Sequence, residues 1–421
     1  MSRLCSLSVL LFLCAPAVAQ LKPTDWPQFR GPTGQGVSAA KGLPSKWSQT
    51  ENLAWKTPLP GPGTSSPIVL GDKIYLTCYS GFGVPGQRGG DMAQLKLHLV
   101  CASATNGKIA WTKDIAPKLP EQDRIRDDHG YASSTPATDG ERVYCFFGKS
   151  GVFAFDLDGN QLWTADVGSQ VNGFGTGASP VVAGNLLIVN ASVESQTLFA
   201  LDKKTGREVW KAKGIREAWN TPVLMPRPGG KSELVLGMQG KVVSFDPATG
   251  DQLWTCANDI TWYIVPSVVT HDDTVWSIGG RSGVVACAVK AGGKGDVTKS
   301  HRQWTSRVGS NVTSPVYHDG HLYWMNDNLG IAYCAEAATG KIVYEERMDR
   351  PGQVYASALL ADGKVYYLTR DGRTLVLAAT PKFERIGLND LGDRSTFNAS
   401  PAVAGNKLLI RSDKFLYCVG K

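Results

Sequence analysis

The sequence predicts an all-β fold built from eight copies of one unit, and three recurring features lead to this prediction. The first is a Ser or Thr beside a Pro, which recurs about every 45 residues along most of the chain. A fixed period of this size indicates a series of similar supersecondary units. The eight occurrences are Ser66-Pro67, Thr135-Pro136, Ser179-Pro180, Thr221-Pro222, Pro266-Ser267, Ser314-Pro315, Ser357-Ala358, which lacks the proline, and Ser400-Pro401.

The second feature is a tight turn that follows the Pro in most units. Pairs of Gly with Asp or Asn tolerate positive φ and favour hairpins. Alternating apolar runs flank these turns, as at 180–183 and 186–190, and a third run follows at 197–201. Period-two runs of this composition are typical of strands. The turns are Gly71-Asp72, Asp139-Gly140, Gly184-Asn185, Asp319-Gly320, Asp362-Gly363 and Gly405-Asn406.

The third feature is another turn, in which a Gly stands four residues before a large aromatic residue. We expect the Gly to take the left-handed conformation and the aromatic side chain to pack against the neighbouring unit. This turn leads into a fourth strand. The matching pairs are Gly107/Trp111, Gly159/Trp163, Gly206/Trp210, Gly250/Trp254 and Gly340/Tyr344.

Four antiparallel strands per unit, with Gly turns and one large aromatic residue, are typical of β-propeller blades, so eight units predict an eight-bladed β-propeller. We find no α-helical period after the N-terminal segment. The eighth unit has only three strands, at 401–404, 407–411 and 415–419. The run 52–59, which contains Trp55, resembles a fourth strand. We therefore expect this N-terminal strand to complete blade eight and close the ring.

The N-terminal segment has the pattern of a secretory signal. Residues 1–19 carry Arg3, then an apolar stretch, then Ala17-Val18-Ala19, which predicts cleavage near Ala19. The mature chain is then expected to be secreted or periplasmic. Residues 20–421 would form one propeller domain, with 20–50 packing on the ring. No later stretch is long and apolar enough to span a membrane.

Charge and cysteine content narrow the classes of partner. The formal net charge is +7, but the basic residues are scattered, which argues against nucleic-acid binding and leaves a protein or cell-envelope partner. A monomer is compatible with this surface. Seven cysteines follow the signal segment, and four of them occupy third strands, where a thiol serves as a small buried group. They are expected to be unpaired; the four are Cys101, Cys287, Cys334 and Cys418.

The repeats resemble the quinoprotein-type repeat, whose motif is Ala-x-Asp-x-x-Thr-Gly-x-x-x-Trp. The best matches are 200–210, ending in Trp210, and 244–254, ending in Trp254. The opening 25–32 is similar to the N-terminal segment of secreted bacterial members. One branch of this group comprises dehydrogenases that use pyrroloquinoline quinone and calcium, and another comprises noncatalytic scaffolds like the outer-membrane assembly factor BamB. The repeat motif alone does not separate the branches.

Other residues favour the BamB-like branch. The dehydrogenase branch has adjacent cysteines against its cofactor, a calcium site of Glu, Asn and Asp, and an Asp base, and no motif here supplies them. The resemblance therefore implies a noncatalytic scaffold with no catalytic residue and no cofactor. A dehydrogenase with pyrroloquinoline quinone and calcium is the alternative, and an envelope glycan-binding module is a further one. The chain departs from BamB-like lipoproteins in lacking a lipobox.

The loops that lead into each first strand are unusually aromatic and polar, and they are expected to converge at one end of the ring. Such a mouth would bind a partner, because aromatic side chains give large contact areas and Asn supplies hydrogen bonds. The alternative is that the rings only pack the blade entrances. The predicted binding residues are Tyr131, Phe174, Trp219, Asn220, Tyr263, Asn311, Tyr355, Phe397 and Asn398.

One charged loop is a weak candidate for a metal site. Asp127, Asp128 and His129 are adjacent, and oxygen-rich loops can hold calcium. Adjacent carboxylates on a loop are more commonly solvated. Two insertions, 79–95 and 291–301, interrupt the repeat, and insertions on a rigid scaffold often carry binding specificity, although Gly-rich segments equally serve as spacers.

Overall fold

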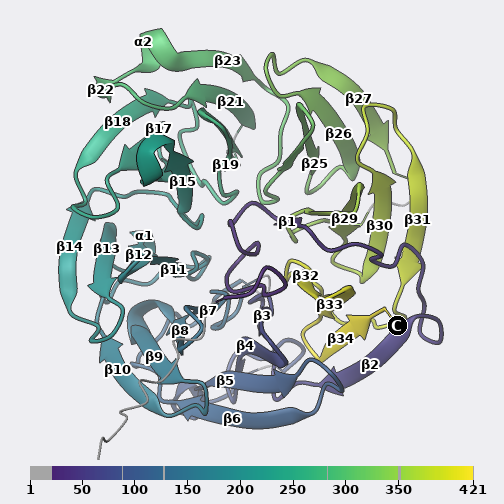
Figure 1. The fold of residues 1–421 in the computed structure, drawn as a ribbon. Coiled ribbons are helices and arrows are strands. Elements are labelled where there is room, and N and C mark those ends of the chain that lie inside the picture. Colours follow the sequence, from purple (N-terminus) through teal and green to yellow (C-terminus); the bar gives the residue numbers. More distant parts are fainter. Residues whose placement is uncertain (1–20, 88, 127–128, 282, 349–351, 421) are drawn as a thin grey trace, which may run out of the picture.

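The computed structural model describes residues 21–420 apart from 88, 127–128, 282 and 349–351. In this part of the chain the strands form eight sheets arranged around a common axis, which confirms the predicted eight-bladed β-propeller (Figure 1). Each blade is an antiparallel four-stranded sheet whose first strand lies near the axis and whose fourth strand lies at the rim. The predicted signal segment lies outside the described residues.

Blades 1 to 4 follow the chain without interruption. Their strands are β3 (Ile68–Leu70), β4 (Lys73–Ser80), β5 (Lys96–Ser103) and β6 (Ile109–Ile115); β7 (Ala137–Thr138), β8 (Arg142–Phe146), β9 (Val152–Asp156) and β10 (Gln161–Ala165); β11 (Val181–Ala183), β12 (Leu186–Ala191), β13 (Thr197–Asp202) and β14 (Glu208–Lys213); and β15 (Val223–Arg227), β16 (Lys231–Met238), β17 (Lys241–Phe245) and β18 (Gln252–Ala257).

Blades 5 to 8 continue in the same order, and the last takes its outer strand from the N-terminal part of the chain. Their strands are β19 (Val269–His271), β20 (Thr274–Gly279), β21 (Val285–Lys290) and β23 (Arg302–Ser306); β24 (Val316–His318), β25 (His321–Met325), β26 (Ile331–Glu336) and β27 (Ile342–Arg347); β28 (Leu359–Ala361), β29 (Lys364–Leu368), β30 (Arg373–Ala378) and β31 (Arg385–Asp390); and β32 (Ala402–Ala404), β33 (Lys407–Arg411), β34 (Phe415–Val419) and β2 (Leu53–Pro58).

Short elements decorate this ring. Strand β1 (Val37–Ser38) pairs in parallel with β28, and β22 (Gly295–Asp296) pairs in parallel with β18. The helical turns are few and short, in keeping with the predicted all-β class. They are α1 (Ser192–Ser195), α2 (Thr298–His301) and the 3-10 turns η1 (Met92–Gln94), η2 (Gly148–Ser150) and η3 (Pro228–Gly230).

The ring closes as predicted. Strand β2 pairs antiparallel with β34, and Trp55 lies opposite Cys418. An outer strand from one end of the chain therefore completes a blade whose other strands come from the opposite end. This closure joins the first and last blades without an open seam in the ring.

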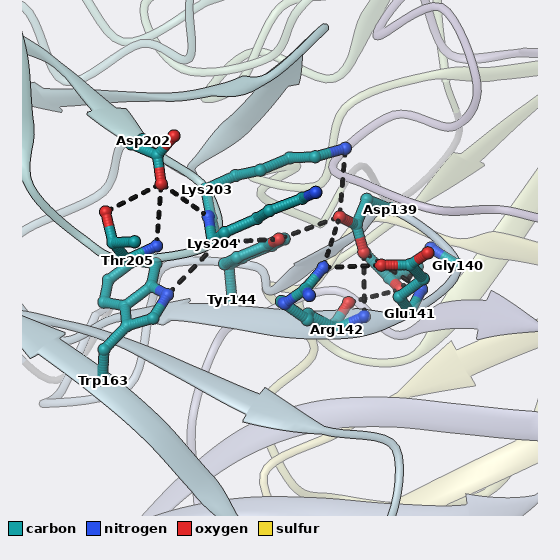
Figure 2. A network of polar contacts seen from close by, with 11 residues as sticks. Asp139, Gly140, Glu141, Arg142, Tyr144, Trp163, Asp202, Lys203, Lys204 and Thr205 are labelled. Carbon is teal, nitrogen blue, oxygen red and sulfur yellow. Dashed lines mark hydrogen bonds and ion pairs between the residues drawn. The ribbon is translucent and has the colours of Figure 1, made fainter. Parts of the chain in front are cut away.

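In five places the Trp of one blade packs on the Gly turn of the next, as predicted. Gly206 has a φ of 73°, and a Cβ atom there would lie 2.5 Å from the Trp163 ring of the preceding blade. The Trp163 Nε1 donates a hydrogen bond to the Lys203 carbonyl at 3.2 Å in the same turn (Figure 2). Only glycine leaves room for the indole in this turn. Equivalent contacts join Gly107 to Trp55, Gly159 to Trp111, Gly250 to Trp210 and Gly340 to Trp304.

Trp254 departs from this pattern because the next blade replaces the turn with the insertion 291–301. Its Nε1 donates to the Glu233 carboxylate at 2.6 Å within its own blade. The Glu233 carboxylate also pairs with Arg227 at 3.1 Å. The insertion forms β22 and α2, which lie along β18 at the outer edge of the blade (Figure 1). The insertion thus extends blade 4.

The Ser or Thr of each repeat forms a closed belt of hydrogen bonds around the axis. In the described chain, the backbone N–H of each of these residues donates to the side-chain hydroxyl of the corresponding residue in the next blade, at 2.9 to 3.2 Å. The last of these bonds, from Ser400 to Ser66, joins blade 8 to blade 1. The members of this belt, all buried, are Ser66, Thr135, Ser179, Thr221, Ser267, Ser314, Ser357 and Ser400.

A polar network adds a further link between blades 2 and 3 (Figure 2). Asp139, in the first turn of blade 2, accepts hydrogen bonds from the backbone of Arg142 at 2.8 Å and from the Tyr144 hydroxyl at 2.9 Å. Lys203 of blade 3 reaches the same carboxylate at 3.1 Å. Burial disfavours the charged carboxylate, but these hydrogen bonds outweigh burial and lower the pKa of Asp139.

The seven described cysteines are all free and buried, which confirms the expectation of unpaired thiols. Burial raises the pKa of Cys101, Cys334 and Cys418 to about 11. A thiol with so high a pKa is protonated at neutral pH and therefore a poor nucleophile.

The segment before β2 runs across one end of the ring (Figure 1). Trp26 exchanges backbone hydrogen bonds with Val69 of blade 1, and the Gln35 side chain bonds Thr270 of blade 5. Arg30 is buried there and donates to the Gln35 carbonyl at 2.9 Å. Burial lowers the pKa of Arg30 to about 9. Among the described residues, no helix has the length and apolar composition needed to cross a bilayer.

Candidate functional site

The candidate site lies at the end of the ring opposite the N-terminal segment, which we call the mouth. Successive strands of a blade run in opposite directions. The loops that lead into the first strands and the loops that join the second and third strands therefore lie at the same end of the ring, which is the mouth. Inside the ring, the belt residues line a channel with Trp219, Tyr355 and Phe29. Its cavity volume is about 90 Å³, well below the roughly 300–1,000 Å³ of typical small-molecule pockets. Ligand-sized space lies outside this channel: one cavity of about 760 Å³ lies against the N-terminal segment, with Gln28, Gln35 and His271 in its wall, and another of about 610 Å³ lies at the mouth.

Four aromatic residues gather on one side of the mouth. The ring centroid of Tyr263 lies 4.6 Å from that of Phe174 and 4.9 Å from that of Trp219. Trp219 and Tyr263 are buried, and the Trp219 Nε1 donates to the Gly175 carbonyl at 2.9 Å. Trp262 completes the cluster with 37% of its surface exposed. The cluster thus has a buried base and an exposed edge.

Two arginines lie on this aromatic cluster. The guanidinium carbon of Arg126 is 4.7 Å from the centre of the Phe174 ring, and that of Arg281 is 5.1 Å from the same centre. Arg281 also approaches the rings of Tyr263 and Trp262, at 5.5 and 6.0 Å. These are cation–π distances, so the rings hold both guanidinium groups at the mouth.

A cavity of about 610 Å³ opens beside this cluster. A third arginine, Arg370, forms part of its wall, stacked on Tyr355 at 4.5 Å and donating to the side-chain oxygens of Gln353 and Asn398. The cavity is the size of a ligand pocket. Its lining residues come from blades 5, 6 and 7 and from the loop before blade 2; they are Arg126, Arg281, Val284, Asn311, Asn326, Asp327, Asn328, Leu329, Gln353, Tyr355 and Arg370.

The acidic residue in this wall is already engaged. The Asp327 Oδ1 accepts hydrogen bonds from the Asn311 backbone at 2.9 Å and from the Ser310 hydroxyl at 3.2 Å. Its Oδ2 accepts one from the Asn328 side chain at 2.7 Å. Asp327 is buried, and its hydrogen bonds to Ser310 and Asn311 hold two loops together.

The structure brings several predicted binding residues to the mouth and removes others from its surface. Tyr355, Asn398 and Trp219 line the channel, and Asn311 lines the cavity. Tyr131 is half-buried, packs edge-on against Tyr79 and donates its hydroxyl hydrogen bond to the Gln122 carbonyl. Phe174 is half-buried beneath the two arginines.

Two predicted binding residues are packing residues instead. Asn220 is buried, and its side-chain nitrogen donates to the Gly237 carbonyl at 2.7 Å. Phe397 is fully buried, stacks on Tyr417 and leaves no room for a side chain at Gly372. Neither side chain presents a surface to a partner. Their burial fits the alternative interpretation, in which such residues pack the blade entrances.

The weak metal candidate gains no support from its described member. Asp127 and Asp128 lie outside the described residues, and His129 lines the channel while its carbonyl accepts hydrogen bonds from Thr64 and Ser133. In the described part of the chain, no three side chains of the His, Cys, Asp or Glu type converge as metal ligands.

The sequence interpretation missed Arg126, Arg281, Arg370 and Leu329. It considered the aromatic loops before the first strands, whereas three of these four residues lie in loops between second and third strands. The available signal was topological: in an antiparallel blade both kinds of loop reach the same end. Charged or apolar residues in the loops between second and third strands were therefore candidates for binding residues at the mouth.

Eight four-stranded blades, joined by Trp–Gly contacts and a hydroxyl belt, define an eight-bladed β-propeller with quinoprotein-type repeats and a cationic, aromatic mouth. The chain belongs to the family of the outer membrane protein assembly factor BamB, whose family model matches residues 96–346 and 238–382. It is 24% identical over 361 residues to the outer membrane protein assembly factor BamB of Burkholderia pseudomallei, covering 82% of this chain and 81% of that relative.

Solved structures agree on the fold. BamB from Moraxella catarrhalis superposes with a TM-score of 0.61 at 15% identity, covering 86% of this chain and 97% of that one. The quinohemoprotein alcohol dehydrogenase from Comamonas testosteroni gives a TM-score of 0.62 at 12% identity, covering 96% and 81%. At such identities the likeness concerns the fold, which both branches share.

Proposed function

We propose that this protein is a noncatalytic scaffold of the cell envelope that binds a protein partner at its mouth and takes part in assembling outer membrane proteins. Membership of the BamB family supports the class of function. The observation that carries the choice of site is the open mouth, where a 610 Å³ cavity lies beside an exposed aromatic edge and exposed cations. A rigid ring that presents loops in this way is suited to binding.

A noncatalytic role also agrees with the chemistry of the described residues. All seven thiols are free and buried, and burial raises the pKa of several of them to 11 or above. The chain has no adjacent cysteine pair to pack against a quinone, and no three His, Cys, Asp or Glu side chains converge as metal ligands in the part described. These features favour the scaffold over a dehydrogenase that uses pyrroloquinoline quinone and calcium.

A periplasmic location follows from the same proposal. The signal-like residues 1–19 would direct export, and an assembly factor for outer membrane proteins acts on the inner side of that membrane. Edman sequencing or mass spectrometry of the exported chain checks the cleavage. A new N-terminus near residue 20 in the periplasmic fraction is expected, and an uncleaved chain in the cytoplasm would contradict the location.

A matched pair of substitutions tests the site. Leu329 lines the cavity and is 47% exposed, whereas Val209 is 53% exposed on the outer strand β14. In cells that lack the native chain, we expect V209D to restore the levels of outer membrane proteins and L329D to fail, although both variants fold. Equal restoration by both variants would place the functional surface elsewhere on the ring.

A further inference from the structure

The two arginines on the aromatic cluster are cations whose charge the described residues do not neutralise. Arg126 and Arg281 are both exposed, and their side chains stack on the faces of Phe174, Trp262 and Tyr263. No carboxylate among those residues forms an ion pair with either. A guanidinium group stacked on a ring keeps its N–H groups at its edge, where they can bind a carboxylate in a bidentate manner.

The cavity beside them has the same electrostatic character. Three arginines contribute to its wall against one carboxylate, that of Asp327, which is buried. Its Oδ1 accepts hydrogen bonds from Ser310 and Asn311, and its Oδ2 accepts one from the adjacent Asn328. Arg370 is held in place by the side-chain oxygens of Gln353 and Asn398. The wall is therefore net positive and preorganised, because its cations are fixed by rings and amides. Such a wall attracts anionic groups.

Apolar surface lies next to these cations. Leu329 is 47% exposed in the same cavity wall, and the exposed edge of Trp262 lies under Arg281. The Asn311 side chain lines the cavity too, and its Oδ1 has no hydrogen-bond partner in the described structure. A ligand that carries carboxylates beside apolar side chains, on a backbone that can form hydrogen bonds, would match this combination of cations, apolar surface and a polar Asn311 side chain. A small, purely polar anion would leave the apolar surface uncovered.

We infer that the mouth binds an acidic peptide segment of the partner, whose Asp or Glu carboxylates lie on Arg126 and Arg281 and whose apolar side chains cover Leu329 and Trp262. This inference rests on the proposed function and specifies the chemistry of the partner. The segment is extended or loop-like, because it must enter a cavity among the loops of three blades. A free polycarboxylate such as citrate carries the same anionic groups as an acidic peptide. The experiment therefore distinguishes a peptide ligand from a small polycarboxylate ligand.

Fluorescence anisotropy of the mature protein tests the inference. The probe is a capped, labelled peptide of sequence Gly-Glu-Leu-Glu-Trp-Glu-Gly, and the control peptide carries Gln in place of every Glu. We expect saturable binding of the acidic peptide, at least tenfold tighter than the Gln peptide, which corresponds to about 1.4 kcal/mol. Raising NaCl to about 0.5 M should weaken this binding, because exposed charges are screened.

Paired variants assign the effect to the mouth. The double variant R126Q/R281Q should lose at least tenfold in affinity, whereas R207Q, which removes an exposed cation at the opposite end of the ring, should bind like the wild type. The variant R126E/R281E should instead prefer a peptide with Lys in place of Glu. That gain of binding also shows that the altered protein is folded.

Three results would overturn the inference. Equal affinity for the Glu and Gln peptides would remove the carboxylate requirement. Unchanged binding by R126Q/R281Q would place the contact elsewhere. Citrate that competes as strongly as the peptide would identify a small polycarboxylate as the ligand. If any of these occurs while L329D still fails to restore outer membrane protein levels, the proposed function stands without this partner chemistry. If L329D restores those levels, the mouth is excluded as the functional site.

Discussion

Removing one hydroxyl from the belt should destabilise the protein measurably. In the belt, the Ser179 hydroxyl accepts the backbone N–H of Thr135 at 3.0 Å, and both residues are only 2% exposed. The substitution S179A therefore leaves a buried N–H without an acceptor. Leaving such a group unsatisfied costs about 1–3 kcal/mol, more than the net value of an ordinary hydrogen bond. We expect a loss of this size in the free energy of unfolding.

Another buried serine provides the matched control. Ser277 is 1% exposed on β20, but its hydroxyl has no hydrogen-bond partner in the described structure. The substitution S277A removes the same atoms from an equally buried site and should be neutral or slightly stabilising. The difference between the two variants isolates the belt hydrogen bond from the general effect of replacing a buried serine.

Urea unfolding followed by tryptophan fluorescence measures both variants, because the unfolding midpoint falls with stability when the slope is unchanged. The double variant S179A/S400A changes two belt bonds in blades 3 and 8, and its loss should equal the sum of the single losses within about 0.5 kcal/mol. A midpoint for S179A that coincides with those of the wild type and S277A would refute the structural role of the belt.

Three further predictions follow from single sites. G206A should lose more than about 3 kcal/mol in unfolding free energy, because left-handed φ costs about 1–2 kcal/mol and its Cβ would lie 2.5 Å from Trp163. Gly184 has a φ of 60° with open space around it, so G184A should lose only the cost of the left-handed backbone. Burial raises the pKa of Glu194 from 4.5 to about 7, so the folded state holds a proton that the unfolded state releases. Stability should therefore fall by about 3 kcal/mol as pH rises through that window, and E194Q should remove this slope in unfolding titrations; an identical slope in E194Q would contradict the assignment. Addition of pyrroloquinoline quinone and calcium should give no alcohol oxidation with an artificial electron acceptor, and turnover that needs both additions would contradict the noncatalytic role.

The fold was predictable because each blade repeats its own local chemistry. Gly206 and Trp210 mark a turn and the aromatic residue of the strand that follows it within a few residues, and the three-stranded eighth unit points to β2 as the missing strand. The role of the belt was less accessible. Ser179 and its equivalents are visible as a repeat, but their hydrogen bonds cross between blades and exist only once the ring is closed.

The candidate site was predictable only in part. The entrance loops do converge at one end, but burial along them depends on packing between blades, which separates exposed Trp262 from its buried neighbour Tyr263. The same dependence turned Asn220 into a buried bridge to Gly237. Arg126 and Arg281 are far apart in sequence and meet on Phe174 only in the closed ring, so no local pattern could pair them.

The most direct test of the central claim is site-specific photo-crosslinking in the cell envelope. A photoreactive phenylalanine analogue at position 329 would report on the mouth, and the same residue at position 209 on the outer rim. We expect a defined crosslink at 329 to one envelope protein, identified by mass spectrometry through an acidic segment, and none at 209. The same crosslink from both positions, or from 209 alone, would contradict binding at the mouth.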